Sequence, residues 1–307
     1  MDRPTIDSSA PESAGWFASA RSWIDLLRCR QWVKNLLVAT PLLAAHVFSA
    51  SAALTAGISM VAFCLAASSV YLVNDLADAG GDRRHPLKRN RPLAAGTISS
   101  PAAVAVAAAL LAAAVAAGAF ISWRFLAVVS AYVLAATAYT FLLKRKLIID
   151  AITLAGLYCL RILAGAVAVN VPLSIWLMMF SMFAFFCLAL LKRYSELTMH
   201  VAAGLPEPAN RSYLARDLTA LISIASAAGF AAVVVFGLYL SSPAVHALYR
   251  RSWVLWLEAP LLLYWMSRII VLAHRQRLRD DPLVFATSDP GSLISATLAA
   301  LIWACAL

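Results

Sequence analysis

Three aspartates at the end of one apolar run are the residues with the clearest chemical potential in this 307-residue chain. Asp75, Asp78 and Asp82 follow the apolar run 60–73, and their spacing places them on one face of an α-helix. Carboxylates beside hydrocarbon are costly, and three on one face repel unless a cation lies among them. Oxygen ligands favour a hard ion, and Mg²⁺ that also binds substrate phosphates fits best. The pattern therefore predicts catalytic, metal-binding aspartates.

Basic residues follow these aspartates at once. A solvated loop would explain bases alone, but it would not explain acids at the very end of an apolar helix. Acids for a metal beside bases for phosphate favour chemistry on a diphosphate. Gly80 and Gly81 are expected to loosen the helix, so that Asp82 becomes a loop ligand. The bases are Arg83, Arg84, Lys88, Arg89 and Arg91, and all but Arg84 are candidate phosphate ligands.

Composition predicts the elements that hold these residues. The chain is 63% hydrophobic and 13% charged, with a mean hydropathy of +0.81. These values are typical of a polytopic, all-α membrane protein. We expect about nine transmembrane helices around a central cavity open to the cytoplasm. The expected spans are 33–50, 54–74, 101–121, 124–143, 148–170, 172–191, 217–240, 253–273 and 290–306.

These spans leave one domain and a short tail. Residues 1–20 are polar and lack the apolar core of a signal peptide, so they are interpreted as a flexible cytosolic arm. Residues 21–307 are expected to form a single transmembrane catalytic domain. Pro172 is a good start for the sixth span. The five cysteines have neither metal-ligand nor paired-redox spacing and are interpreted as small core residues.

Lysine and arginine predict the orientation. Twenty of the 25 fall on the side that holds the aspartates, three on the other side and two within spans. The positive-inside rule makes the rich side cytoplasmic. We therefore expect a multi-pass protein of the bacterial inner (plasma) membrane with its active site facing the cytoplasm. The net charge of +10 is then a topology signal, and it requires no nucleic-acid partner.

The motif around the aspartates resembles that of a known family. Asn74, Asp75, Asp78 and Asp82 match the NDxxDxxxD motif of the UbiA superfamily of intramembrane prenyltransferases, and 88–96 matches that family's Arg-Pro-Leu turn. The resemblance covers nearly the whole chain and agrees with nine spans. It implies that the aspartates bind metal and that Asn74 belongs to the substrate-binding set.

Further stretches are similar to one branch, the decaprenyl-phosphate phosphoribosyltransferases. That branch transfers 5-phosphoribose from phosphoribosyl diphosphate (PRPP) to a polyprenyl phosphate and releases diphosphate. The resemblance therefore implies PRPP and a polyprenyl (decaprenyl) phosphate as substrates, and a product used for arabinan or other cell-envelope polysaccharide precursors. The stretches are 30–35, 71–73, 139–140, 143–145, 160–165, 192–197 and 280–286, together with Asp150.

One position departs from the wider superfamily. Ordinary members carry a second aspartate-rich motif after the sixth helix, whereas this chain has Lys192, Arg193, Tyr194 and Glu196 there. A site that gains positive charge and loses metal ligands suits an additional phosphate. PRPP has one at its 5-position, which a prenyl diphosphate lacks. We expect these four residues to bind substrate, with Lys192 and Arg193 on phosphate and Tyr194 on the ribose.

Basic residues near span ends have two interpretations each. Lys34 and Asn35 open the first span, where a lysine either snorkels to the interface or contacts phosphate. The charges of Lys144 and Arg145 help to set the orientation of the protein in the membrane, and one of the two residues is also expected to contact phosphate. The residues do not decide which.

The roles of two further sets of charged residues are also open. Arg161 lies in the middle of a span, where an unpaired cation is expensive. It either pairs with a neighbouring span or contacts an anion deep in the cavity. Asp280 and Asp281 form either an exposed turn before Pro282 or part of the metal or ribose site.

Two alternative functions compete with phosphoribosyl transfer. The first is a UbiA-type prenyltransferase that moves a prenyl group from a prenyl diphosphate to an aromatic or other hydrophobic acceptor. The second is a transporter of a phosphorylated solute, but the acids lie at one face, and only Glu258 is expected in the outer half. Besides its substrates, the protein is expected to contact membrane lipids, and a homo-oligomer is possible.

Overall fold

Helices build the entire described part of the chain, which comprises residues 21–83, 89–204, 212–278 and 281–307 of a computed structural model. Seven helical segments are long and apolar enough to cross a membrane, and α13 (Pro290–Ala306) is a shorter apolar helix. The prediction of an all-α polytopic membrane protein is confirmed. The expected arm 1–20, Lys88 and Asp280 lie outside the described residues.

The seven long segments correspond to seven of the nine expected spans, and α13 to the ninth. They are α3 (Ala50–Asp82), α5 (Ser100–Ile121), α6 (Trp123–Ala138) with η2 (Tyr139–Leu143), α7 (Ile149–Ala168), α8 (Ile175–Ala202), η3 (Ala215–Asp217) with α9 (Leu218–Leu240), and η4 (Ser252–Leu257) with α11 (Glu258–His274). Shorter elements are η1 (Cys29–Ala39), α2 (Thr40–Ala44), α4 (Pro92–Ala95), α10 (Pro243–Leu248) and α12 (Pro282–Ala286).

Serine side chains mark several helix starts. Ser122 ends α5 in an extended conformation and caps α6, because its hydroxyl accepts the backbone N–H of Phe125 at 3.1 Å. Ser174 caps α8 in the same way through Leu177. The sixth span therefore begins at Ile175, and its expected start at Pro172 is wrong by three residues.

The expectation of a loosened helix at Gly80 and Gly81 is also wrong. α3 runs unbroken through both glycines to Asp82, over 33 residues. Each glycine costs a helix only about 1 kcal/mol relative to alanine, which a long helix held by packing tolerates. Asp82 is consequently a helical residue that is held in register with Asp75 and Asp78.

The first expected span differs most from its prediction. It is a 3₁₀ helix, η1, followed by the five-residue α2. Gly165 of α7 explains how closely this segment packs: a Cβ at that position would lie 1.9 Å from the carbonyl oxygen of Val38. The absence of a side chain there lets η1 press against α7 and places Lys34 and Asn35 in the interior.

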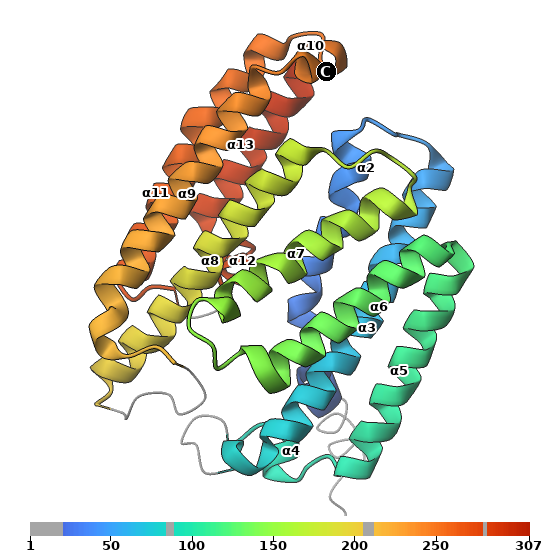
Figure 1. Cartoon of the computed structure of the whole chain (residues 1–307), viewed down its shortest axis with the longest axis vertical. Coiled ribbons are helices and arrows are strands. Elements are labelled where there is room, and N and C mark those ends of the chain that lie inside the picture. The colour runs from blue at the N-terminus through green and yellow to red at the C-terminus, as the bar shows by residue number, and fades with distance from the viewer. Residues whose placement is uncertain (1–20, 84–88, 205–211, 279–280) are drawn as a thin grey trace, which may run out of the picture.

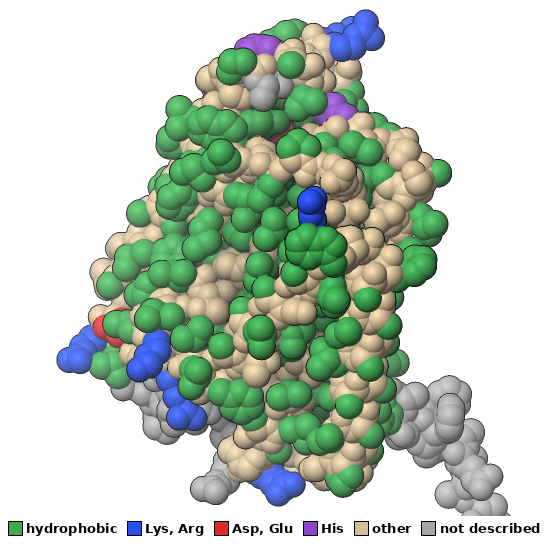
Figure 2. Space-filling view, turned by 45° about the vertical axis from the view of Figure 1, so that its right-hand side comes forward, with side chains coloured by type: hydrophobic (Ala, Val, Ile, Leu, Met, Phe, Trp, Pro, Cys, Tyr) green, Lys and Arg blue, Asp and Glu red, His purple; other side chains and the backbone are tan. Residues whose placement is uncertain are grey.

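Two groups of helices meet at α7 and α8. One contains α3, α5, α6 and α7, and the other contains α8, α9, α11 and α13 (Figure 1). Each group has its own buried apolar cluster. In Figure 1 α4 lies at the lower end, and α10 and the C-terminus lie at the upper end. Figure 2 shows one face largely covered by hydrophobic side chains, with several Lys and Arg side chains at the lower end.

Candidate active site

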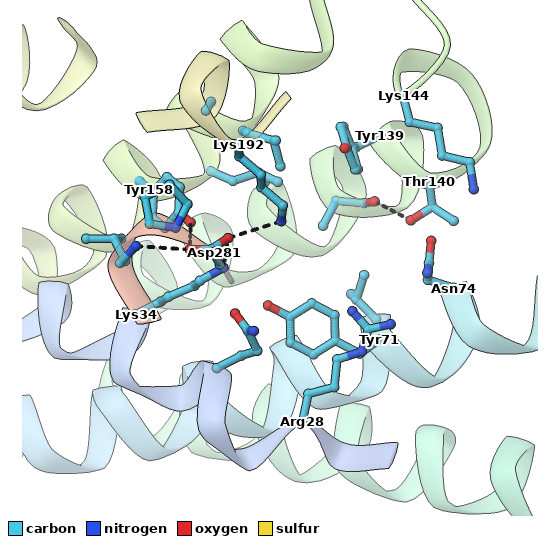
Figure 3. Close-up of a pocket in the computed structure, with 18 of the residues that line it drawn as sticks. Arg28, Lys34, Tyr71, Asn74, Tyr139, Thr140, Lys144, Tyr158, Lys192 and Asp281 are labelled. Atoms are coloured by element: carbon cyan, nitrogen blue, oxygen red, sulfur yellow. Dashed lines mark hydrogen bonds and ion pairs between the residues drawn. The ribbon is translucent and has the colours of Figure 1, made fainter. Parts of the chain in front are cut away.

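A cavity of about 430 Å³ lies between the two groups of helices. Its walls come from η1, α3, α6, η2, α7, α8 and the start of α12. Figure 3 shows Asp281, Lys34, Lys192 and Tyr158 across the cavity from Asn74, Thr140 and Lys144. The other polar or aromatic residues that line it are Arg28, Gln31, Tyr71, Asp78, Arg91, Tyr132, Tyr139, Arg161, Arg193, Glu196 and His200.

Each of the three aspartates on α3 pairs with a cation. Asp75 is buried and lies 2.5 Å from Arg28 Nη2. Both carboxylate oxygens of Asp78 accept a hydrogen bond from Lys144 Nζ, at 2.8 and 3.1 Å. Of the three, only Asp78 lines the cavity, beside Asn74. Lys144 also lines it, so the structure favours Lys144 over the exposed Arg145 as a residue that meets substrate.

Two of the three aspartates converge on one cation. One guanidinium nitrogen of Arg91, Nη1, lies 2.7 Å from Asp82 and 3.5 Å from Asp75, so both carboxylates converge on one positive group. Oxygen donors that converge in this way suit Mg²⁺. Among the described residues no group of three His, Cys, Asp or Glu side chains is arranged so that it could hold a metal ion. A metal would therefore replace arginine and lysine contacts, and the metal-ligand assignment stays a prediction.

Lys34 and Lys192 share one carboxylate on the opposite wall. Asp281 Oδ2 accepts Lys34 Nζ at 2.7 Å and Lys192 Nζ at 3.1 Å, and the Tyr158 hydroxyl lies 3.5 Å from Oδ1. Burial disfavours the charge of Asp281, but the two lysines outweigh it and hold the pKa of the carboxyl well below its usual range. Asp281 is thus part of the site and not an exposed turn.

Arg161 reaches the same cavity from α7, and its described partners are all neutral. It donates to Asn35 Oδ1 at 2.8 Å, to the Leu157 carbonyl at 2.7 Å and to the Tyr132 hydroxyl at 2.9 Å. The guanidinium also lies over the Tyr132 ring, 4.7 Å from its centroid. Asn35 is therefore a support for Arg161 and does not itself line the cavity.

Arg193 also lines the cavity, but its guanidinium is engaged by protein groups. It donates to Asp150 at 2.7 Å, to Glu196, and to the Tyr139 hydroxyl at 2.9 Å. Asp150 is fully buried and also accepts the hydroxyl of Tyr213. These contacts join α7, α8 and η2, so Arg193 holds the wall together. The expectation that it binds phosphate gains no support from this geometry.

The remaining predicted site residues lie away from the cavity wall. Arg83 is exposed and donates to the Ala94 carbonyl at 3.3 Å, and Arg89 is exposed. Tyr194 contacts His274 of α11 at 2.9 Å and does not line the cavity, which leaves the ribose-positioning role without support.

Sequence reasoning missed the tyrosines of the cavity. Tyr71, Tyr132, Tyr139 and Tyr158 lie on three different helical segments and on η2, and all four line the wall. The available signal was a tyrosine inside an apolar span, because a buried hydroxyl normally requires a partner. In the sequence, Arg28 contributes only to the predicted membrane orientation, whereas in the structure it pairs with Asp75.

Comparison with known proteins establishes the family. Residues 35–304 match the model of the UbiA prenyltransferase family. The chain belongs to this family. It is accordingly a multi-pass membrane transferase of the UbiA superfamily, and the family resemblance of its aspartate motif is confirmed.

The names of the similar proteins do not all specify a reaction. Nodulation protein NoeC of Azorhizobium caulinodans is 33% identical over 273 residues, which are 89% of each chain. Protein y4nM of Sinorhizobium fredii is 34% identical over 282 residues, and the matched region spans only 55% of its length. A decaprenyl-phosphate phosphoribosyltransferase of Mycolicibacterium smegmatis is 36% identical over 210 residues, which are 66% of each chain.

A solved UbiA homolog shares the fold. The structure from Archaeoglobus fulgidus, bound to GPP and Mg²⁺, superimposes with a TM-score of 0.68 and covers 92% of this chain and 98% of its own. At 18% identity this likeness shows the fold alone. It also shows that a protein with this fold binds Mg²⁺.

Proposed function

We propose that this UbiA-family protein transfers 5-phosphoribose from PRPP to a polyprenyl phosphate and releases diphosphate. The observation that carries the proposal is the wall formed by Lys34, Arg161 and Lys192. These three cations line the cavity, and Asp281 is the one described carboxylate that pairs with Lys34 and Lys192. Excess positive charge in a partly buried site favours an additional phosphate, which both PRPP and the lipid phosphate supply. The similarity to the Mycolicibacterium enzyme supports the same choice.

The opposite wall suits the departing diphosphate. Asp75, Asp78 and Asp82 would hold Mg²⁺, with Asn74 beside them, and Arg91 and Lys144 would contact phosphate oxygens. When bound there, Mg²⁺ supplies charge neutralisation to the leaving group. Arginine offers two parallel donors to a phosphate, whereas lysine acts as a point charge.

Transfer breaks the bond between ribose C1 and the diphosphate oxygen, and its electron pair leaves with diphosphate. An oxygen of the lipid phosphate then forms the new bond to C1. This nucleophile is anionic at neutral pH, so the protein needs no general base. Its residues align the two phosphates and exclude water. The proposed site faces the cytoplasm of a bacterial inner membrane, where PRPP and Mg²⁺ are available.

The test compares two labelled donors with purified protein in liposomes. Labelled PRPP with polyprenyl phosphate is expected to give a labelled lipid in the presence of Mg²⁺, and labelled prenyl diphosphate with an aromatic acceptor is not. Asp78→Asn is expected to abolish transfer, whereas Asp25→Asn, at an exposed position outside the cavity, keeps it. Prenyl transfer without ribosyl transfer, or solute uptake without either, would replace the proposal with one of the alternative functions.

A further inference from the structure

A second cavity, of about 230 Å³, lies at the end of the molecule opposite α4. Residues of α8, α9, α11 and α13 surround it, and aromatic rings dominate its wall. Glu258, the first residue of α11, is the single charged residue in the lining. None of this wall belongs to the cavity that holds the aspartates of α3.

Glu258 has no partner for its charge within the described part of the chain. Its side chain is half-buried, and it makes neither a hydrogen bond nor an ion pair with any described residue. A carboxylate that is partly removed from water and lacks a counter-ion is costly. The cavity beside it is therefore a place where a ligand cation would be stabilised.

The aromatic wall points to the same chemistry. Trp303 Nε1 donates to the Tyr249 hydroxyl at 3.0 Å, and Tyr239 lines the same wall. The polar groups of Trp303 and Tyr249 satisfy one another. Phe180 and Phe236 add rings 6.0 Å apart. Rings beside a carboxylate attract alkylammonium groups, through cation–π contact and ion pairing together.

The surroundings of the cavity indicate which kind of alkylammonium group would bind there. Trp253 and Trp256 of η4 are exposed, and exposed tryptophans at the end of a membrane bundle are typical of the interface with water. Arg250 and Arg251, also exposed, begin the same segment and suit a lipid phosphate. The alkylammonium groups that such an interface would supply are phospholipid head groups.

We propose that this cavity binds the ammonium head group of a membrane phospholipid, with Glu258 as its counter-ion and the rings of Phe180 and Phe236 against it. The bound lipid connects α8, α9, η4, α11 and α13 at one end of the bundle. The site is independent of the transfer reaction and of the proposed substrates.

The experiment is native mass spectrometry of the purified full-length protein. It is titrated with phosphatidylethanolamine or phosphatidylglycerol of identical acyl chains. The wild type is expected to bind the ethanolamine lipid about fivefold more tightly, in keeping with one cation–π and one ion-pair contact. Glu258→Gln and Phe236→Leu are each expected to remove this preference, while Asp25→Asn, an exposed acid outside both cavities, retains it.

Phe236→Leu keeps the carboxylate and a similar side-chain volume, so it tests the aromatic contribution even if Glu258→Gln is poorly folded. Equal binding of the two lipids to the wild type would overturn the proposal. A preference that persists in Glu258→Gln would also overturn it. Neither result depends on whether the protein transfers phosphoribose.

Discussion

Two buried arginines on the cavity wall have different roles because their partners differ in charge. Arg193 has two carboxylate partners, so its charge is neutralised within the protein. Every hydrogen bond of Arg161 within the described part of the chain is with a neutral group, so its charge is available to an anion. Arg193 is therefore expected to matter for folding, and Arg161 for substrate.

Arg161→Lys tests this assignment. Lysine keeps the charge but cannot donate to both Asn35 and Tyr132 from one planar group. Since hydrogen bonds of charged groups contribute about 1.5–3 kcal/mol, kcat/KM is expected to fall by about tenfold or more. Tyr132→Phe removes one of these bonds and should have the smaller effect. Wild-type kcat/KM in Arg161→Lys would contradict the assignment.

Asp281 predicts a pH dependence of stability. Its carboxyl has a lowered pKa in the folded protein because Lys192 and Lys34 outweigh the effect of burial. Such a group stabilises the folded state above its unfolded pKa of about 3.9, and the contribution is lost as the pH falls toward the lower, folded value. Asp281→Asn should therefore lower Tm at neutral pH, and the difference from wild type should shrink below about pH 4. A difference that stays constant with pH would refute this.

At the scale of elements, the close contact of α7 with η1 depends on one glycine. A Cβ on Gly165 would lie 1.9 Å from the Val38 carbonyl oxygen and 3.1 Å from Pro41 Cδ. Backbone atoms cannot move out of the way as the end of a flexible side chain can. The contact therefore constrains the position of η1, and with it Lys34 on the cavity wall.

Gly165→Ala is expected to destabilise the protein by about 1–3 kcal/mol, or more if η1 must move. Gly156→Ala is the matched control on the same helix, because nothing lies within 4 Å of a Cβ there. It should be stabilising by up to about 1 kcal/mol through helix propensity. Denaturation of both variants in detergent gives the comparison, and equal Tm values would count against the close contact.

Local signals were sufficient for most helices and insufficient for one. Long apolar runs predicted the spans, and the aspartates share a helix face as their spacing requires. The 3₁₀ form of η1 was not predictable from local signals, and Gly165, the residue it packs against, lies more than a hundred residues away. The partners of Asp281 were likewise unpredictable, since Lys34 and Asp281 are 247 residues apart.

At the scale of the whole molecule, the distribution of basic residues predicts one orientation. Two variants allow a direct test. In each the native cysteines are replaced, and a single new cysteine is introduced by Arg145→Cys or by Arg250→Cys. A membrane-impermeant maleimide is expected to label the first only after permeabilisation and the second in intact cells. The reverse labelling would place the candidate active site outside the cytoplasm.

The ion pair of Lys34 with Asp281 also has a consequence for synthesis. It joins η1 to the N-cap of α12, close to the C-terminal end of the chain, so the cavity wall is completed only when nearly the whole chain has left the ribosome. Until then Lys34 and Lys192 lack their shared carboxylate. A nascent or C-terminally truncated chain therefore has the aspartates of α3 but an unfinished opposite wall, and it is expected to lack the activity proposed for the complete site.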